Sequence, residues 1–212
     1  MTDSVAGVLM AGGQSRRMGG GDKCLRALAG KPILAHVIDR VRPQVGLLVL
    51  NANGDPGRFA AFGLPVVADV VGDFAGPLAG VLTGLEWAAA QAPESDSPGA
   101  WLASFATDAP FLPADLVARL LAAVVAEGAD MACAASDGRD HPVFGLWPLR
   151  LRHELRHAMV AEGIRKVDLW TARYRMTRVD FPLVETPAGP LDPFFNANRP
   201  EDLAEAERLA RA

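Results

Sequence analysis

The chain has 212 residues, of which half are hydrophobic and 22% are charged, and its formal net charge is -4. This composition favours a well-buried core and excludes a disordered chain, and the acidic balance gives no general reason to expect binding to nucleic acid. The length suits one domain spanning residues 1–212. The first residues, MTDSVAG, lack the features of a secretion signal, and no apolar run reaches the roughly 20 residues that cross a bilayer. We therefore expect a cytoplasmic protein that does not bind membranes.

Strand-like and helix-like segments alternate along the first part of the chain. Residues 5–10 form a short, continuous apolar run, typical of a strand buried on both faces, and lead into the stretch GGQSRRMGGGDK. Residues 31–42 space their apolar side chains at three and four and carry Pro32 near the start, which predicts a helix. Further strands are predicted at 45–50, 65–68, 100–106 and 130–135, helices at 76–90 and 113–127, and a polar loop at 93–99.

The pattern changes after residue 136. A polar turn precedes the β-like HPVFGLW, and a helical pattern, one more strand and an irregular stretch follow at 149–162, 176–181 and 186–198, before a last helix from Pro200. Strands that alternate with helices are joined as parallel strands with helices on both faces. The sequence therefore predicts an α/β fold, a single-domain, predominantly parallel three-layer α/β/α sandwich.

Several predicted strands end in groups that suit ligand binding. The glycine-rich stretch, Asn51, Asp69 and Asp108 each follow a strand. Parallel sheets bind ligands beyond the carboxyl ends of their strands, so we expect these groups at one edge. Asparagine and aspartate are also common turn formers, and an aspartate before Pro110 can instead cap the helix that follows.

The glycine-rich stretch suits a nucleoside triphosphate. Glycines let main-chain N–H groups approach phosphate oxygens, Arg16 or Arg17 can grip phosphate through a planar fork, and Lys23 adds a mobile charge. The Walker spacing fails because Cys24 follows Lys23, and the dinucleotide fingerprint GxGxxG is absent. A solvated loop without a ligand is the alternative.

Other reactive side chains form no catalytic pattern. Cys24 and Cys133 match no metal-ligand spacing and are expected to be reduced thiols. Histidines 36, 153 and 157 fit helix surfaces or the core. No covalent nucleophile with a paired base is present in the sequence pattern.

The stretch MAGGQSRRMGGGDK, from Met10 to Lys23, resembles the signature of the pyrophosphorylase-like nucleotidyltransferases. Further motifs follow in that family's order: NAN at 51–53, Asp69, GPLAG at 76–80, TDAPF at 107–111, DHP at 140–142 and FFNANRPEDL at 194–203. Together they are most similar to the molybdenum cofactor guanylyltransferases, which attach GMP to molybdopterin. The chain departs from the usual family pattern at Met10, where leucine is common, and at Arg199, where threonine is common.

The resemblance implies a Rossmann-like nucleotidyltransferase fold that transfers GMP from GTP to the terminal phosphate of molybdopterin and releases pyrophosphate, with Mg²⁺ as cofactor. It implies a nucleotide-binding half at about residues 1–135 and an acceptor-binding half at about 136–212. Catalytic roles are implied for Lys23, Asp108 and Arg17, with Asp108 as metal ligand. GTP contacts are implied at Met10, Ala11, Gly12, Gly13, Lys23, Asn51, Asp69 and Asp108, and molybdopterin contacts at His141, Asn196 and Asn198.

Alternatives stay open at this point. The same chemistry occurs in molybdopterin cytidylyltransferases and sugar-phosphate nucleotidyltransferases, although Gly12-Gly13 favours GTP over the AAG pattern of the cytidylyltransferases. A non-catalytic nucleotide-binding regulator is a third possibility, against which Asp108 and Lys23 argue. His141 can be a buried turn residue, and the two late asparagines can merely shape the turn before Pro200. The expected partners are GTP and molybdopterin as substrates and other cofactor-biosynthesis proteins in transient contacts, without nucleic acid or membrane; we expect a monomer.

Overall fold

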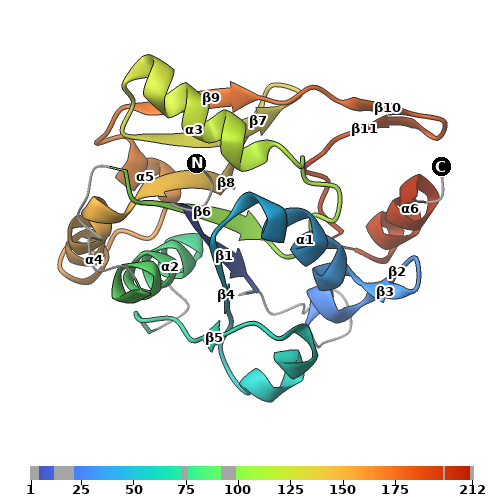
Figure 1. Cartoon of the computed structure of the whole chain (residues 1–212), viewed down its shortest axis with the longest axis horizontal. Helices are drawn as coiled ribbons and strands as arrows, with labels where there is room; N and C mark the ends of the chain where they lie inside the picture. The colour runs from blue at the N-terminus through green and yellow to red at the C-terminus, as the bar shows by residue number, and fades with distance from the viewer. Residues whose placement is uncertain (1–4, 12–21, 73–75, 92–98, 198, 211–212) are drawn as a thin grey trace.

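The computed structural model describes residues 5–11, 22–72, 76–91, 99–197 and 199–210 (Figure 1). A seven-stranded sheet has the order β5-β4-β1-β6-β8-β7-β9. Its strands are β1 (Val5–Met10), β4 (Leu47–Asn51), β5 (Val66–Val67), β6 (Trp101–Ala106), β7 (Met131–Ser136), β8 (Arg139–Pro148) and β9 (Met176–Asp180). β8 runs antiparallel to β6 and β7, whereas the other neighbouring pairs of this sheet are parallel.

Helices cover both faces of this sheet. They are α1 (Ile33–Val41), α2 (Pro77–Gln91), α3 (Leu116–Glu127), α4 (Arg152–Val160), α5 (Val167–Thr171) and α6 (Pro200–Ala210). Apolar side chains of α1, α3 and α6 share one core cluster with Leu9 of β1, while those of α2, α4 and α5 share another with Val8. Neighbouring residues of a strand point to opposite faces, so β1 supplies both cores. The predicted three-layer α/β/α sandwich is confirmed.

Two glycines on the inner face of helix α2 leave no room for a side chain between the helix and the sheet. A Cβ atom at Gly84 would lie 2.8 Å from the Val8 Cβ. A Cβ atom at Gly80 would lie 2.7 Å from the Met10 sulfur and 2.8 Å from Asn51 Oδ1. The last glycine of the GPLAG motif therefore makes room for the ends of β1 and β4, where the site is expected.

The β7–β8 ladder contains a bulge. Ala134 pairs with His141, but the preceding Cys133 pairs with Gly145, so residues 142–144 of β8 have no counterpart on β7. The bulge contains Pro142, which has no N–H to donate to a ladder. Because β8 is antiparallel to its neighbours, His141 near its start lies at the edge where β6 and β7 end.

Two small hairpins flank the last helix. They are β2 (Ala27–Leu28) with β3 (Lys31–Pro32), and β10 (Val184–Thr186) with β11 (Gly189–Leu191). Helix α6 contacts both, because Glu207 accepts the Ala29 N–H and Arg208 donates to the Ala188 carbonyl (Figure 1). Neither hairpin was predicted, and the expectation of an irregular stretch at 186–198 was wrong for its first residues.

Other differences from the predicted elements are small. The helix predicted at 149–162 begins with a 3-10 turn, Leu149–Leu151, and α4 ends at Val160. Helix α5 and the 3-10 helices Arg42–Gln44 and Pro56–Phe62 were not predicted. Most of the polar loop predicted at 93–99 lies outside the described residues. Among the residues that the structure describes, no helix is long and apolar enough to span a membrane.

Candidate active site

Three of the predicted strand-end groups, Asn51, Asp69 and Asp108, lie at one edge of the sheet, and residues 12–21 of the glycine-rich stretch lie outside the described residues. β1 pairs with β4 on one side and with β6 on the other, so this edge of β1 is the point where the strand order reverses, the usual ligand crevice of an open α/β sheet. The Ala11 N–H donates to the Asn51 carbonyl at 2.9 Å. The Thr107 hydroxyl donates to the Met10 carbonyl at 3.2 Å. These bonds join the ends of β1, β4 and β6 into one platform.

Lys23 and Asp108 form an ion pair on this platform. Lys23 Nζ lies 2.8 Å from Asp108 Oδ2, and their side chains are 20% and 17% exposed. Lys23 begins the 3-10 turn Lys23–Leu25, and Asp108 follows β6. Below the pair, the buried Cys24 thiol hydrogen-bonds the Thr107 side chain, and burial raises the pKa of Cys24 to about 11. The thiol is therefore protonated at neutral pH and serves packing rather than chemistry.

Asn51 and Asp69 are held in contact by direct hydrogen bonds. The buried Asn51 amide donates to Asp69 Oδ1 at 2.9 Å and to the Val67 carbonyl at 3.3 Å. Asn53 donates to Asp69 Oδ2 at 2.8 Å and accepts the Asp69 N–H at 2.9 Å. Each carboxylate oxygen keeps a further lone pair, so the group can still accept donors from a ligand.

Arg58 is a further candidate site residue, which the sequence did not indicate. Its Nε lies 2.6 Å from Asp22 Oδ2, and its terminal nitrogens donate to the Asn53 and Asp55 carbonyls at 2.6 and 2.9 Å. The Nε contact is an ion pair without hydrogen-bond alignment. Arg58 thus joins the residue before Lys23 to the loop that holds Asp69. The sequence offered only the turn signal DPG before it.

The expected acceptor residues reach the same edge from the second half of the chain. The Ala197 N–H donates to the Asp108 carbonyl at 3.0 Å, which places Asn196 next to the end of β6. Asn196 Oδ1 is buried and has no hydrogen-bond partner among the described residues. His141 Nε2 lies 2.7 Å from Ser136 Oγ at the end of β7.

The structure therefore gathers Met10, Ala11, Lys23, Asn51, Asp69, Asp108, His141 and Asn196 at this edge. Gly12, Gly13, Arg17 and Asn198 lie outside the described residues. Arg199, which stands where threonine is common, starts α6 with a cap of another kind. The Arg199 N–H donates to the Asp202 carboxylate at 2.8 Å, so Asp202 accepts as the third helical residue of a capping box does. The Arg199 carbonyl accepts the Leu203 N–H.

A metal ion fits this edge at Asp108. Within the described residues, no group of three or more His, Cys, Asp or Glu side chains is arranged to hold a metal. Mg²⁺ commonly takes only one or two protein carboxylates and completes its shell with phosphate oxygens and water. The partly exposed oxygens of Asp108, at a strand end beside a lysine, suit such a shared site.

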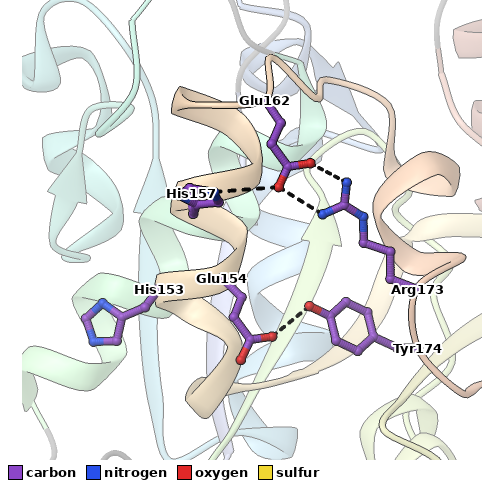
Figure 2. A pocket seen from close by; sticks show the side chains of 6 residues that line it. All are labelled: His153, Glu154, His157, Glu162, Arg173 and Tyr174. Atoms are coloured by element: carbon purple, nitrogen blue, oxygen red, sulfur yellow. Dashed lines mark hydrogen bonds and ion pairs between the residues drawn. The ribbon is translucent and has the colours of Figure 1, made fainter.

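A separate hollow lies on the other half of the molecule, between α4 and the chain after α5 (Figure 2). Its ionisable groups pair with one another: Glu162 with Arg173 and His157, and Glu154 with the Tyr174 hydroxyl. Burial, followed by the hydrogen bond to Glu154, raises the pKa of Tyr174 to about 12. These groups satisfy each other and form no pattern for catalysis.

Comparisons with known proteins agree with this geometry. Residues 7–175 match the family model described as MobA-like NTP transferase domain. The chain is 60% identical over 209 residues to a protein named molybdenum cofactor guanylyltransferase from Bradyrhizobium sp. (strain ORS 278), covering 99% of this chain and 94% of that protein. A protein of the same name from Mesorhizobium japonicum is 50% identical over 212 residues, covering 100% and 99%. The fold and these relatives define a nucleotidyltransferase.

Solved structures share the fold. The crystal structure of molybdopterin-guanine dinucleotide biosynthesis protein A from Archaeoglobus fulgidus superposes with a TM-score of 0.69 at 21% identity, covering 98% of each chain. Rv0371c from Mycobacterium tuberculosis has a TM-score of 0.67 at 17% identity, covering 98% of this chain and 99% of that chain. Its structure in complex with manganese has a TM-score of 0.64 at 17% identity, covering 97% and 98%. The chain belongs to the MobA-like NTP transferase family, which confirms the resemblance found in its sequence.

Proposed function

We propose that the protein transfers GMP from GTP to the terminal phosphate of molybdopterin. The observation that carries this proposal is the single platform that joins the Lys23–Asp108 pair, the Asn51–Asp69 pair and the segment with Asn196. A nucleotide and an acceptor can meet there. The relatives at 50–60% identity, which are named molybdenum cofactor guanylyltransferases, support this reading.

The base and ribose would bind at the ends of β1 and β4. Guanine presents N–H groups on its Watson–Crick edge, and the Asn51–Asp69 pair offers carboxylate lone pairs in a fixed orientation. Met10 and Ala11 would add main-chain contacts. Gly12 and Gly13 belong to the same proposal, as loop residues whose N–H groups approach the phosphates.

The transfer itself needs positioning and charge. A terminal phosphate oxygen of molybdopterin attacks the α-phosphorus of GTP, the bond to the β-phosphate oxygen breaks, and pyrophosphate leaves. Lys23 would bring its ammonium to the phosphates from its position beside Asp108, and Arg17 would bind phosphate through its planar guanidinium. Mg²⁺ held by Asp108 would supply charge neutralisation on the phosphate groups.

The acceptor would be held by the second half of the chain. We assign molybdopterin contacts to His141, Asn196 and Asn198, within one domain whose residues from about 1 to 135 bind nucleotide and from about 136 to 212 bind acceptor. The proposal further takes the protein to be a cytoplasmic monomer that meets other cofactor-biosynthesis proteins only transiently.

The test is pyrophosphate release by purified protein with Mg²⁺, molybdopterin and each of the four nucleoside triphosphates. GTP should exceed CTP by at least about 10²-fold in kcat/KM, since leaving buried polar groups of the base pocket unpaired costs about 3 kcal/mol. Mass spectrometry of the product should show the guanine dinucleotide of the pterin. Equal use of CTP would favour a cytidylyltransferase. If no triphosphate gave pyrophosphate release, a non-catalytic nucleotide-binding regulator would be the remaining alternative.

A further inference from the structure

A chain of three polar side chains connects β7, β8 and the loop before α6. The Ser136 hydroxyl donates to Asp192 Oδ1 at 2.7 Å, and His141 Nε2 lies 2.7 Å from the same Ser136 oxygen. Ser136 is only 1% exposed, so water does not compete for these bonds. Asp192 follows β11, 56 residues away in sequence from Ser136.

Counting hydrogens gives the tautomer of His141. A serine hydroxyl carries one hydrogen, and a carboxylate can only accept, so that hydrogen lies between Ser136 and Asp192. The Ser136 oxygen can then only accept from His141, which requires the proton on Nε2. In the neutral ring, Nδ1 consequently carries a lone pair. No described residue makes a hydrogen bond with this atom.

The same residues hold the loop that carries Asn196. Asp192 Oδ1 also accepts the Phe194 N–H at 2.9 Å, and the Phe194 ring packs on the His141 ring with centroids 4.6 Å apart. At its other end the loop is tied to Asp108 through the Ala197 N–H. Asn196 therefore lies on a segment fixed at both ends, and its buried Oδ1 lacks a partner among the described residues.

We infer that Ser136 and Asp192 are positioning residues that hold His141 as its Nε2–H tautomer, so that Nδ1 and Asn196 Oδ1 accept hydrogen bonds from the pterin. The inference rests on the proposed function. A pterin presents an amino group and ring N–H groups as donors, and two fixed acceptors match them. Burial lowers the pKa of His141 against the opposing effects of Asp192 and Asp140, and Arg139 adds to the lowering, so the ring is neutral at neutral pH.

The first test reads the tautomer directly. Nitrogen-15 NMR of histidine-labelled protein, with His141 assigned through the His141→Gln variant, should show the Nε2–H form in the wild type. Ser136→Ala and Asp192→Ala should lose that preference. Asp192→Asn should keep it, because its amide oxygen can still accept from Ser136 and Phe194. A wild-type Nδ1–H form, or an unchanged tautomer in Ser136→Ala and Asp192→Ala, overturns the inference.

The second test reads acceptor binding. The KM for molybdopterin should rise about tenfold in Ser136→Ala and His141→Gln, while the Kd for GTP stays within about twofold, as for loss of one remote binding interaction. Thr171→Val, which removes a buried hydroxyl on α5, is the matched control and should change neither. Asp192→Ala should also raise the KM for molybdopterin, whereas Asp192→Asn should keep the wild-type KM. An unchanged KM despite a changed tautomer overturns the inference.

These tests separate two kinds of failure. If the wild type releases no pyrophosphate with GTP and molybdopterin, the proposed function fails whatever the NMR shows. If transfer occurs but the KM for molybdopterin responds to Asn196→Ala and not to Ser136→Ala, the function stands and the role of Ser136 and Asp192 is overturned. Unchanged GTP binding in each variant shows that the fold is intact.

Discussion

Gly80 offers the sharpest link between packing and substrate binding. A methyl group at this position would meet the Met10 sulfur at 2.7 Å and Asn51 Oδ1 at 2.8 Å. Gly80→Ala must therefore move α2 or turn the Asn51 amide, which holds Asp69 at 2.9 Å. We expect this substitution to weaken GTP binding more than its effect on stability would suggest.

The size of each effect follows from known costs. Overpacking a core lowers the free energy of unfolding by about 1–3 kcal/mol, and replacing glycine with alanine in a helix interior raises it by about 1 kcal/mol. The net loss of about 1 kcal/mol corresponds to a fall in Tm of about 2–4 °C for a chain of this size. Losing one hydrogen bond of about 1 kcal/mol at Asp69 raises the KM for GTP about fivefold.

Gly84→Ala is the matched control. Its methyl group would lie equally close to the sheet, 2.8 Å from Val8 and 2.9 Å from Leu102, but near no site residue. Both variants should lose similar Tm in calorimetry, and Gly84→Ala should keep the KM for GTP within about twofold. Equal KM values in the two variants would refute the reasoning, since the effect would then come from general loosening of α2.

Three further predictions concern charged and titrating groups. Asp108→Asn should lower kcat at least about 10²-fold at saturating Mg²⁺ while a cooperative melt is kept, because an amide is a poor metal ligand; near wild-type turnover would remove Asp108 from the metal site. Arg58→Ala should raise the KM for GTP about tenfold, because it removes the contacts with Asp22 and Asn53 and a hydrogen bond to a charged group is worth about 1.5 kcal/mol. Arg173→Ala in the α4 hollow is the control and should leave this KM unchanged. Equal effects of the two substitutions would show that Arg58 is an ordinary surface residue. Because burial lowers the pKa of His141 below 6.5, the unfolded chain binds its proton first, and stability should fall as pH drops below about 6.5. His141→Gln should flatten the dependence of Tm on pH between 8 and 5, and superimposable curves for the two proteins would contradict this.

The strands of the first half of the chain were predictable because their signals are local. β1, β4 and β6 are short apolar runs, and a glycine-rich stretch, Asn51 and Asp108 stand at or just after their ends in the sequence. The crossing order then brings these ends together without further information. Asn51, Asp69, Lys23 and Asp108 were found in this way, and the structure brings them into contact as two pairs.

The partners that orient these groups were not predictable. Arg58 reaches Asp22 across 36 residues, and Ser136 reaches Asp192 across 56, so neither pairing has a periodic or spacing signal. Ser136 in particular ends a strand whose residues are all buried, and a small serine at such a position gives no sign of a function in the sequence. Only tertiary packing shows that its single hydroxyl connects a histidine to a carboxylate.

The second half of the chain contains an irregularity that periodicity conceals. β6 pairs with β1 along its whole length, but its ladder with β8 covers only residues 101–103. Beyond that point the Ser104 hydroxyl replaces the ladder, donating to the Val143 carbonyl at 2.6 Å and accepting the Trp147 indole N–H at 2.8 Å. The ladder of β6 with β8 therefore covers neither His141 nor the bulge at residues 142–144.

This break explains why a histidine followed by a proline belongs at the start of β8. A regular antiparallel strand would continue its hydrogen bonds with β6 up to the end that carries Asp108 and would close the sheet there. Proline cannot donate to such a ladder, and the extra residues of a bulge turn neighbouring side chains out of register. His141 is therefore freed from pairing with β6 yet still paired to Ala134 of β7, where Ser136 can hold its ring. The backbone irregularity and the side-chain network act together, since the bulge places the imidazole at the site edge and the hydroxyl fixes which nitrogen it presents.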